Sequence, residues 1–297
     1  MPDEPAILVF SETKGFRHES IEKGKAAFLK IGKEKGFRVD TTESSEAFTE
    51  ENLKQYDAVV FLSTTGDVLT HAQQNDFMRY IQAGGGFLGI HAAADTEYDW
   101  WWYNKLVGAY FQSHPEQQEA VLKKVSGLPE TTESTLPDTW KRKDEWYNYR
   151  RISPAINVLY NLDESSYKGG SNGAEHPIIW YQNFDGGRSY YIGIGHTNES
   201  YTDPLFLEAV QQGLKFSMGS GKLDYSKVHT ERVPEENRFN KVVLKYYLDE
   251  PTEMTILPDG KIIFIERKGN VKLYNPENDS LALINTFNVW SKSEDGM

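Results

Sequence analysis

The chain contains seven histidines, the residues best able to do chemistry in it. Imidazole titrates near neutral pH and also binds transition metals. His91 directly follows an apolar run, residues 87–90, and precedes Ala92 and Ala93. A polar residue between a buried strand and small residues is typical of a sharp turn that presents one side chain. His91 is therefore a candidate acid/base group, substrate hydrogen-bond donor or metal ligand. The alternative is a histidine that only satisfies its neighbours at the turn.

Three more histidines lie after predicted strands or in neighbouring loops. His18 follows the run 6–10 by eight residues, His196 comes just after the run 190–194, and His114 precedes a proline. Parallel sheets bind ligands at the carboxyl ends of their strands, so we expect His18, His91, His114 and His196 to line one pocket. Three imidazoles and an open position would suit zinc or another divalent ion, although no two histidines have the close spacing of a helical metal motif.

Carboxylates and aromatic rings extend this candidate site. Glu145 could be an acid/base group or could accept a sugar hydroxyl, and its neighbour Asp144 is a further candidate carboxylate; solvated charges in a polar loop are the alternative. Residues 98–103 are rich in aromatic rings, whose flat faces suit pyranose rings. We predict the catalytic residues His91, Glu145 and His18, and the substrate-binding residues His114, His196, Arg17, Trp100, Trp146 and Asp95.

Alternating strands and helices are expected to position these residues. Apolar runs predict strands at 6–10, 37–39, 58–62 and 87–90, and helical periodicity predicts helices between them. Thr70 and Gln73 form a capping box, and Asp203-Pro204 opens a last helix. The alternation predicts an α/β fold with a parallel sheet. After about residue 110 the predicted strands follow one another more closely, with a hairpin turn at Asp185-Gly186.

The sequence changes character after residue 219. Residues 220–240 are polar and irregular, which predicts a linker, and residues 241–297 contain four short apolar runs separated by turns. Four such strands make one propeller blade, which cannot bury both faces alone. We therefore expect Ile262, Phe264 and Val271 to lack cover. The predicted domains are 1–219, an α/β domain, and 241–297, a truncated β-propeller start.

Composition excludes several classes of protein. The net charge of −12 argues against nucleic-acid binding, and the absence of cysteine excludes thiol catalysis and disulfides. No apolar run is long enough to span a membrane. The first residues do not form a signal peptide and lead almost directly into a strand. We interpret this as a mature periplasmic or extracellular domain without its leader.

Five stretches of the chain resemble the trehalose-utilisation (ThuA-like) family: 14–18 (KGFRH), 84–96 (GGGFLGIHAAADT), 113–115 (SHP), 144–147 (DEWY) and 191–196 (YIGIGH). The resemblance implies a flavodoxin-like fold similar to class I glutamine amidotransferases, with helices on both faces of the sheet. It also implies a link to sugar use. Amidotransferases place a cysteine at the turn where this chain has His91, so glutamine hydrolysis by a thiol is not expected.

The tail resembles the first blade of glucose/sorbosone dehydrogenase-type propellers, on residues 251–254, 257–261 and 293–296. This resemblance implies that the chain is part of a longer multidomain protein. A quinone cofactor is expected only if the full propeller were present.

Two functions are compatible with these features. The first is an enzyme that hydrolyses or otherwise processes a glucoside or an oxidised (keto) sugar by histidine–carboxylate acid/base chemistry. The alternative is a non-catalytic carbohydrate-binding module serving a fused sugar dehydrogenase propeller. Histidines and a carboxylate within hydrogen-bond reach would favour catalysis, whereas an aromatic cleft without such groups would favour binding. In both cases the partner is a small carbohydrate.

Overall fold

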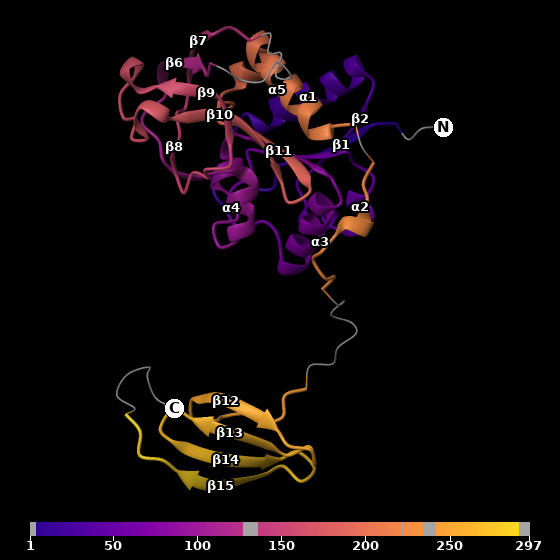
Figure 1. Cartoon of the computed structure of the whole chain (residues 1–297), viewed down its shortest axis with the longest axis vertical. Helices are drawn as coiled ribbons and strands as arrows, with labels where there is room; N and C mark the ends of the chain where they lie inside the picture. Colours follow the sequence, from indigo (N-terminus) through magenta and orange to yellow (C-terminus); the bar gives the residue numbers. More distant parts are fainter. Residues whose placement is uncertain (1–3, 127–135, 221, 234–241, 291–297) are drawn as a thin grey trace. The chain divides into compact units, whose positions relative to one another are not determined.

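The computed structural model describes residues 4–126, 136–220, 222–233 and 242–290, and the chain divides into two compact units, Met1–Val233 and Pro234–Met297 (Figure 1). The helices are α1 (Ile21–Lys35), α2 (Glu50–Leu53), α3 (His71–Gln82), α4 (Trp101–Val107) and α5 (Pro204–Met218). The strands of the first unit are β1 (Ala6–Phe10), β2 (Arg38–Thr42), β3 (Ala58–Leu62), β4 (Gly86–Ile90), β5 (Tyr110–Ser113), β6 (Gln118–Lys124), β7 (Thr139–Asp144), β8 (Asn148–Arg150), β9 (Asn157–Asp163), β10 (Pro177–Phe184) and β11 (Gly187–Ile192).

A nine-stranded mixed sheet forms the centre of the first unit, in the order β2-β1-β3-β4-β11-β10-β9-β6-β7. The neighbours from β2 to β11 pair in parallel, as predicted. A parallel sheet therefore describes only this half, because β10, β9, β6 and β7 pair antiparallel, and the hairpin predicted at Asp185-Gly186 is present. The reason is visible at Asp185-Gly186, a tight turn with φ of 48° and 91° that joins β10 to β11 as a hairpin.

Helices cover both faces of the parallel half (Figure 1). A Cβ on Gly24 of α1 would meet Leu62, and one on Gly213 of α5 would meet Leu88 of β4, so these helices share one face. On the other face, Phe77 of α3 stacks on Phe61 with ring centroids 5.5 Å apart. Phe61 and Leu62 are consecutive, and successive strand residues point to opposite faces. The apolar strands β1, β3 and β4 are therefore buried on both sides.

Both helix caps predicted from the sequence, at Thr70 and Asp203, are present. Thr70 and Gln73 form the predicted capping box on α3, and Asp203 accepts a hydrogen bond from the Leu205 amide at the start of α5. Ser20 precedes α1 but does not cap it with its side chain. Its hydroxyl instead donates to the carbonyl of Gly195 at 3.2 Å, which ties the start of α1 to the segment after β11.

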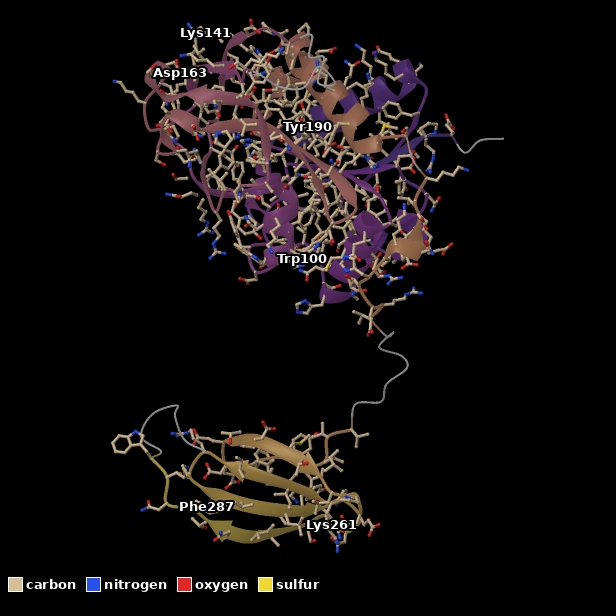
Figure 2. All side chains as sticks on the ribbon, viewed as in Figure 1. Trp100, Lys141, Asp163, Tyr190, Lys261 and Phe287 are labelled. Atoms are coloured by element: carbon tan, nitrogen blue, oxygen red, sulfur yellow. The ribbon has the colours of Figure 1, made fainter. Side chains whose placement is uncertain are left out.

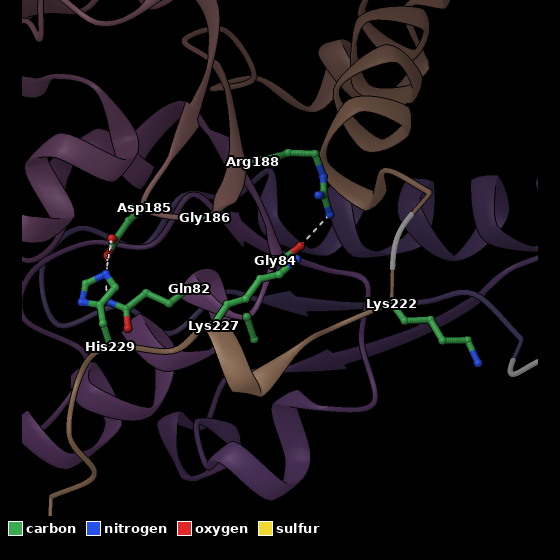
Figure 3. A pocket seen from close by; sticks show the side chains of 9 residues that line it. Gln82, Gly84, Asp185, Gly186, Arg188, Lys222, Lys227 and His229 are labelled. Atoms are coloured by element: carbon green, nitrogen blue, oxygen red, sulfur yellow. Dashed lines mark hydrogen bonds and ion pairs between the residues drawn. The ribbon is translucent and has the colours of Figure 1, made fainter.

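Residues 222–233, which fall in the predicted linker, hydrogen-bond to the first unit. The Asp224 amide donates to the Ala83 carbonyl at 2.7 Å, and His229 pairs with Asp185 at 2.9 Å. Figure 3 shows the small pocket that this segment helps to line, beside Gln82 and Arg188. The pocket lies where β4 and β11 begin, at the opposite sheet edge from His91.

The second unit is a four-stranded antiparallel sheet of β12 (Pro251–Ile256), β13 (Ile262–Glu266), β14 (Asn270–Asn275) and β15 (Ser280–Thr286). The expectation that Ile262 and Phe264 lack cover is wrong, because both are buried with Tyr274 and Leu248 packs against them. Val271 is half-buried, and every residue of the edge strands β12 and β15 is exposed.

The sheet has the strand number predicted for one blade, but the propeller stays a prediction, and residues 293–296 lie outside the described part of the chain. Figure 2 labels one side chain from each unit: Tyr190 on β11 is buried inside the first unit, whereas Phe287, just after β15, is half exposed.

Candidate functional site

Four side chains from distant parts of the sequence form one cluster. His18, His91, Glu145 and His196 each offer a nitrogen or carboxylate oxygen, and these four atoms all lie within 4.8 Å of one another. His18 follows β1, His91 follows β4 and His196 follows β11, so three of them lie beyond the carboxyl ends of parallel strands. Glu145 comes from the antiparallel half, directly after β7.

His91 occupies the centre of this cluster. It is fully buried and has a φ of 49°, a left-handed conformation that is uncommon for a residue other than glycine. Its Nδ1 lies 3.1 Å from the Gly193 carbonyl, and its Nε2 lies 3.2 Å from Nδ1 of His196 and 3.3 Å from Oε2 of Glu145. A carbonyl can only accept, so Nδ1 carries the hydrogen and Nε2 faces the cluster.

A buried carboxylate sets the positions of Glu145 and His196. Asp144 accepts hydrogen bonds from the backbone amides of Glu145, Gly195 and His196, at 2.9, 3.2 and 3.1 Å. It also pairs with Arg142 at 2.9 Å, and Arg142 in turn pairs with Asp203 at 3.0 Å. Asp144 thus joins the end of β7 to the segment after β11, which brings Glu145 to the parallel strands.

The cluster separates charge between its members. Burial disfavours the charged form of Glu145, but its close contacts with His196 and His91 outweigh burial and hold its pKa below the usual range. Burial also acts against the charged form of His196, yet Glu145 raises the pKa of that imidazole. Burial, with His91 and His196 nearby, lowers the pKa of His18 to about 2, which keeps its ring neutral. The site therefore combines an ionised carboxylate, a neutral imidazole and an imidazole that holds a proton readily.

Aromatic and exposed side chains border the cluster. His114 places Nδ1 3.3 Å from Oε1 of Glu145, and 44% of its side chain is exposed. The Phe16 ring is 65% exposed and its centroid lies 4.9 Å from that of His18. Tyr147 packs its ring 4.2 Å from the His91 ring and 4.3 Å from the half-buried ring of Phe111. The exposed residues mark the side from which a ligand can reach the buried ones.

The other predicted substrate-binding residues lie farther from the cluster or are buried. Trp146 as a sugar platform is contradicted, because the ring is fully buried and its nitrogen donates to the Gln118 carbonyl. Trp100 is half-buried and stacks on Trp102, with ring centroids 5.0 Å apart. Because the Trp146 ring is fully buried, a ligand cannot contact it.

Arg17 forms surface ion pairs with Glu43 and Glu22, so its guanidinium is already engaged. Asp95 is half-buried and accepts a hydrogen bond from Tyr98 at 2.5 Å. Burial raises the pKa of Asp95, and the charges of His91 and Glu145 also act on it, which places it at the margin of the site.

Sequence reasoning missed Arg142 and Tyr147, and it gave Asp144 no positioning role. A local signal existed for Tyr147, which is two residues from Glu145 on the same stretch. The local signal for Arg142 was limited to its pair with Asp144, two residues away, because its other partners Ser200 and Asp203 lie about sixty residues along the chain.

The remaining histidines lie outside the cluster. His71 is exposed, as predicted from its place in the first helical turn, and His229 pairs with Asp185. His176 is buried, with one nitrogen 2.8 Å from Glu164 and the other 2.8 Å from the Tyr147 carbonyl. His176 therefore supports the segment behind the site.

A mixed sheet whose parallel half carries a histidine–carboxylate cluster at its carboxyl edge defines an α/β protein with a candidate ligand site at the strand ends. The family model described as "ThuA: Trehalose utilisation" matches residues 6–217, and the chain belongs to this family. The match accounts for most of the first unit and gives the protein a carbohydrate-related role.

Solved structures agree in fold. A ThuA-like protein from Bacteroides uniformis superposes with a TM-score of 0.61 at 22% identity, covering 73% of this chain and 93% of its own. One from Parabacteroides merdae gives 0.63 at 21% identity, covering 78% and 94%. No curated protein matches the sequence. No helix in the described residues is long and apolar enough to cross a membrane.

Proposed function

We propose that the first unit is an enzyme that hydrolyses or otherwise processes a glucoside or an oxidised (keto) sugar. His91, Glu145 and His18 form the catalytic cluster, with Glu145 as the base. His196 and His114 contact the substrate, and His196 also serves as the acid. The observation that carries the proposal is the convergence of three imidazoles and a carboxylate within 4.8 Å in a chain of the trehalose utilisation family. Such a convergence favours chemistry over simple sugar binding.

The arrangement supports both halves of an acid/base reaction. Breaking a glycosidic bond requires a proton on the leaving oxygen, and a keto sugar also carries an acidic proton on the carbon beside its carbonyl. Glu145 is held ionised and can accept a proton, while His196 is held protonated more readily than a free imidazole. A base and an acid 3.1 Å apart are suited to moving protons on one bound sugar.

The border of the cluster is suited to a sugar ring. Phe16 and Phe111 offer apolar ring faces, and His114 offers an exposed polar group beside Glu145. Pyranose rings combine apolar C–H faces with polar hydroxyls, so both kinds of contact would be used. Trp146 is left out of this proposal because it is fully buried.

Turnover of a sugar panel tests the proposal. The chain would be incubated with trehalose, other glucosides and their keto forms, and products followed by NMR. His91→Asn is the informative variant, because asparagine tolerates the left-handed backbone at this position and cannot titrate near neutral pH. We expect turnover to fall by roughly 100-fold or more. His71→Ala, at an exposed histidine, is the matched control and should leave turnover unchanged.

The alternative function is a non-catalytic carbohydrate-binding module. Calorimetry with the same sugars separates the two, since a module would bind a sugar without releasing product from any of them. Binding that is lost in the His91→Asn chain, together with no turnover in the unmodified chain, would establish the module and reject the enzyme.

We also propose that the protein acts in the periplasm or outside the cell and that a longer chain continues the second unit into a quinone-binding propeller. Fractionation of source cells tests the location, and intact-mass analysis of the natural protein tests the length. A cytoplasmic protein ending near residue 297 would reject this part.

A further inference from the structure

Three atoms of the cluster form an almost regular triangle. Nε2 of His91, Nδ1 of His196 and Oε2 of Glu145 are separated by 3.2, 3.3 and 3.1 Å. Each of these atoms carries a lone pair that can bind a proton or a metal ion. At these separations, the three atoms must share a hydrogen or bind a common metal ion.

The hydrogen atoms available on these side chains do not give each of the three atoms a hydrogen-bond partner. His91 uses its Nδ1 hydrogen on the Gly193 carbonyl at 3.1 Å, so its neutral ring presents a bare Nε2 to the cluster. The Glu145 oxygen is an acceptor as well. A single hydrogen on His196 would have to serve both neighbours. Nδ1 of His18 is also buried and has no hydrogen-bond partner.

A metal ion fits the measured distances. Ligand atoms about 2.1 Å from zinc are separated by roughly 3.4 Å in a tetrahedral site and by about 3.0 Å in an octahedral one. The three edges observed here fall between these values. An ion at about 2.1 Å from all three atoms would sit roughly 1 Å out of their plane. The ligand atom of His18 also lies within 4.8 Å of the other three, which makes His18 a fourth candidate ligand.

Neighbouring groups already hold the ligands as metal sites require. Metal-binding histidines usually donate their second nitrogen to a carbonyl or carboxylate, which fixes the ring. His91 makes this contact with Gly193, and Asp144 anchors the backbone amides of Glu145 and His196. The positive φ of His91 is a further sign that the ring is held in place at some conformational cost.

We propose that His18, His91, Glu145 and His196 bind one divalent transition-metal ion. Three imidazoles and one carboxylate suit zinc, and also manganese, iron or cobalt, whereas calcium and magnesium prefer oxygen ligands. His114 and Phe16 border the exposed side, from which water or a sugar oxygen would approach the ion. The metal site does not depend on the nature of the substrate, because it follows from the ligands alone.

Metal binding can be measured without any sugar. The whole chain, expressed without a polyhistidine tag, would be analysed for metal by mass spectrometry, stripped with a chelator and titrated with Zn²⁺, Mn²⁺ and Co²⁺ by calorimetry. We expect about one ion per chain with a Kd below roughly 1 μM for at least one of them. Bound Co²⁺ should also give a visible absorption band that reports on its ligands.

Ligand variants decide whether the cluster is the site. Glu145→Gln and His18→Ala should each weaken binding by roughly 100-fold or more, beyond the effect of changes outside the ligand set. His71→Ala should bind as the unmodified chain does. The metal should raise the melting temperature of the unmodified chain but not of the two variants, since only an ion bound to the native state stabilises it. Circular dichroism confirms that each variant is folded, and His196→Ala replaces any that is not.

The inference is overturned if none of the three ions binds below about 100 μM, or if the folded ligand variants bind as tightly as the unmodified chain. Metal binding without sugar turnover would support the metal site and reject the enzyme. Sugar turnover by a chain that binds no metal ion would reject the metal site and support the enzyme.

Discussion

At the scale of single residues, the site depends on groups that never reach a ligand. Asp144 is fully buried and accepts hydrogen bonds from Arg142, Ser200 and three backbone amides. A buried charge is expensive to leave unpaired, so this carboxylate and Arg142 stabilise the fold only together. Their geometry also determines where the neighbouring Glu145 points.

Replacing Asp144 by asparagine should therefore damage stability and site together. We expect Asp144→Asn to lower the free energy of unfolding by about 3 kcal/mol, because Arg142 loses its buried charge partner. Metal affinity should fall in the same variant, since Glu145 and His196 lose a common anchor. Urea unfolding followed by tryptophan fluorescence measures the first effect and calorimetry the second.

Asp203→Asn is the matched control, because Asp203 is the other carboxylate that Arg142 contacts and is partly exposed. Asparagine can keep the cap on α5, so this change should cost under about 1 kcal/mol. Equal effects of the two substitutions would contradict a special role for Asp144.

At the scale of elements, helix α1 packs closely against the edge strand β2. Gly32 lies in the last turns of α1, where a Cβ would stand 2.4 Å from Val39 of β2 and 2.8 Å from the Phe37 carbonyl oxygen. Gly36 then ends the helix in a left-handed conformation with φ of 77°. The turn from α1 to β2 is therefore tight because residue 32 has no side chain.

Gly32→Ala tests this packing. Alanine favours a helix by up to about 1 kcal/mol over glycine, but overpacking against a backbone oxygen costs about 1–3 kcal/mol. We expect a net loss of about 1–2 kcal/mol in urea unfolding. Lys30→Ala, at an exposed position of the same helix, should change stability by less than about 0.5 kcal/mol. A stabilised Gly32→Ala chain would show that α1 can move away from β2.

At the scale of the whole molecule, the first unit extends beyond the last helix. The backbone amide of Thr230 donates to Gln82 at 3.0 Å, and Lys54 lies over the Tyr225 ring at 4.9 Å. Tyr225 belongs to a segment that sequence composition assigned to a linker. These contacts make residues 222–233 part of the folded unit, although they contain no strand or α-helix.

Truncation tests whether residues 220–233 are a linker or part of the folded first unit. A chain of residues 1–233 should unfold at the same urea concentration as the full chain when followed by the tryptophans of the first unit. A chain of residues 1–219 should lose roughly 2 kcal/mol, because several hydrogen bonds worth about 1 kcal/mol each are removed. Equal stability of the two fragments would show that residues 220–233 are a linker.

Local patterns were sufficient to predict much of the first unit. The buried strands read as continuous apolar runs, and the caps at Thr70 and Asp203 are determined by residues within three positions of one another. His18, His91 and His196 could be expected to converge because carboxyl ends of parallel strands meet at one edge, whatever the distance along the chain.

The tertiary structure alone decided the partners of those residues. Trp146 is next to Glu145 in sequence, yet its ring lies in the core while the carboxylate lies in the cluster. The pairing of β4 with β11 and the ion pair from Arg142 to Asp203 join segments far apart in sequence. Helix caps and apolar runs leave a local pattern because their energies are local. Long-range pairs leave none, since packing selects them only when the whole sheet has formed.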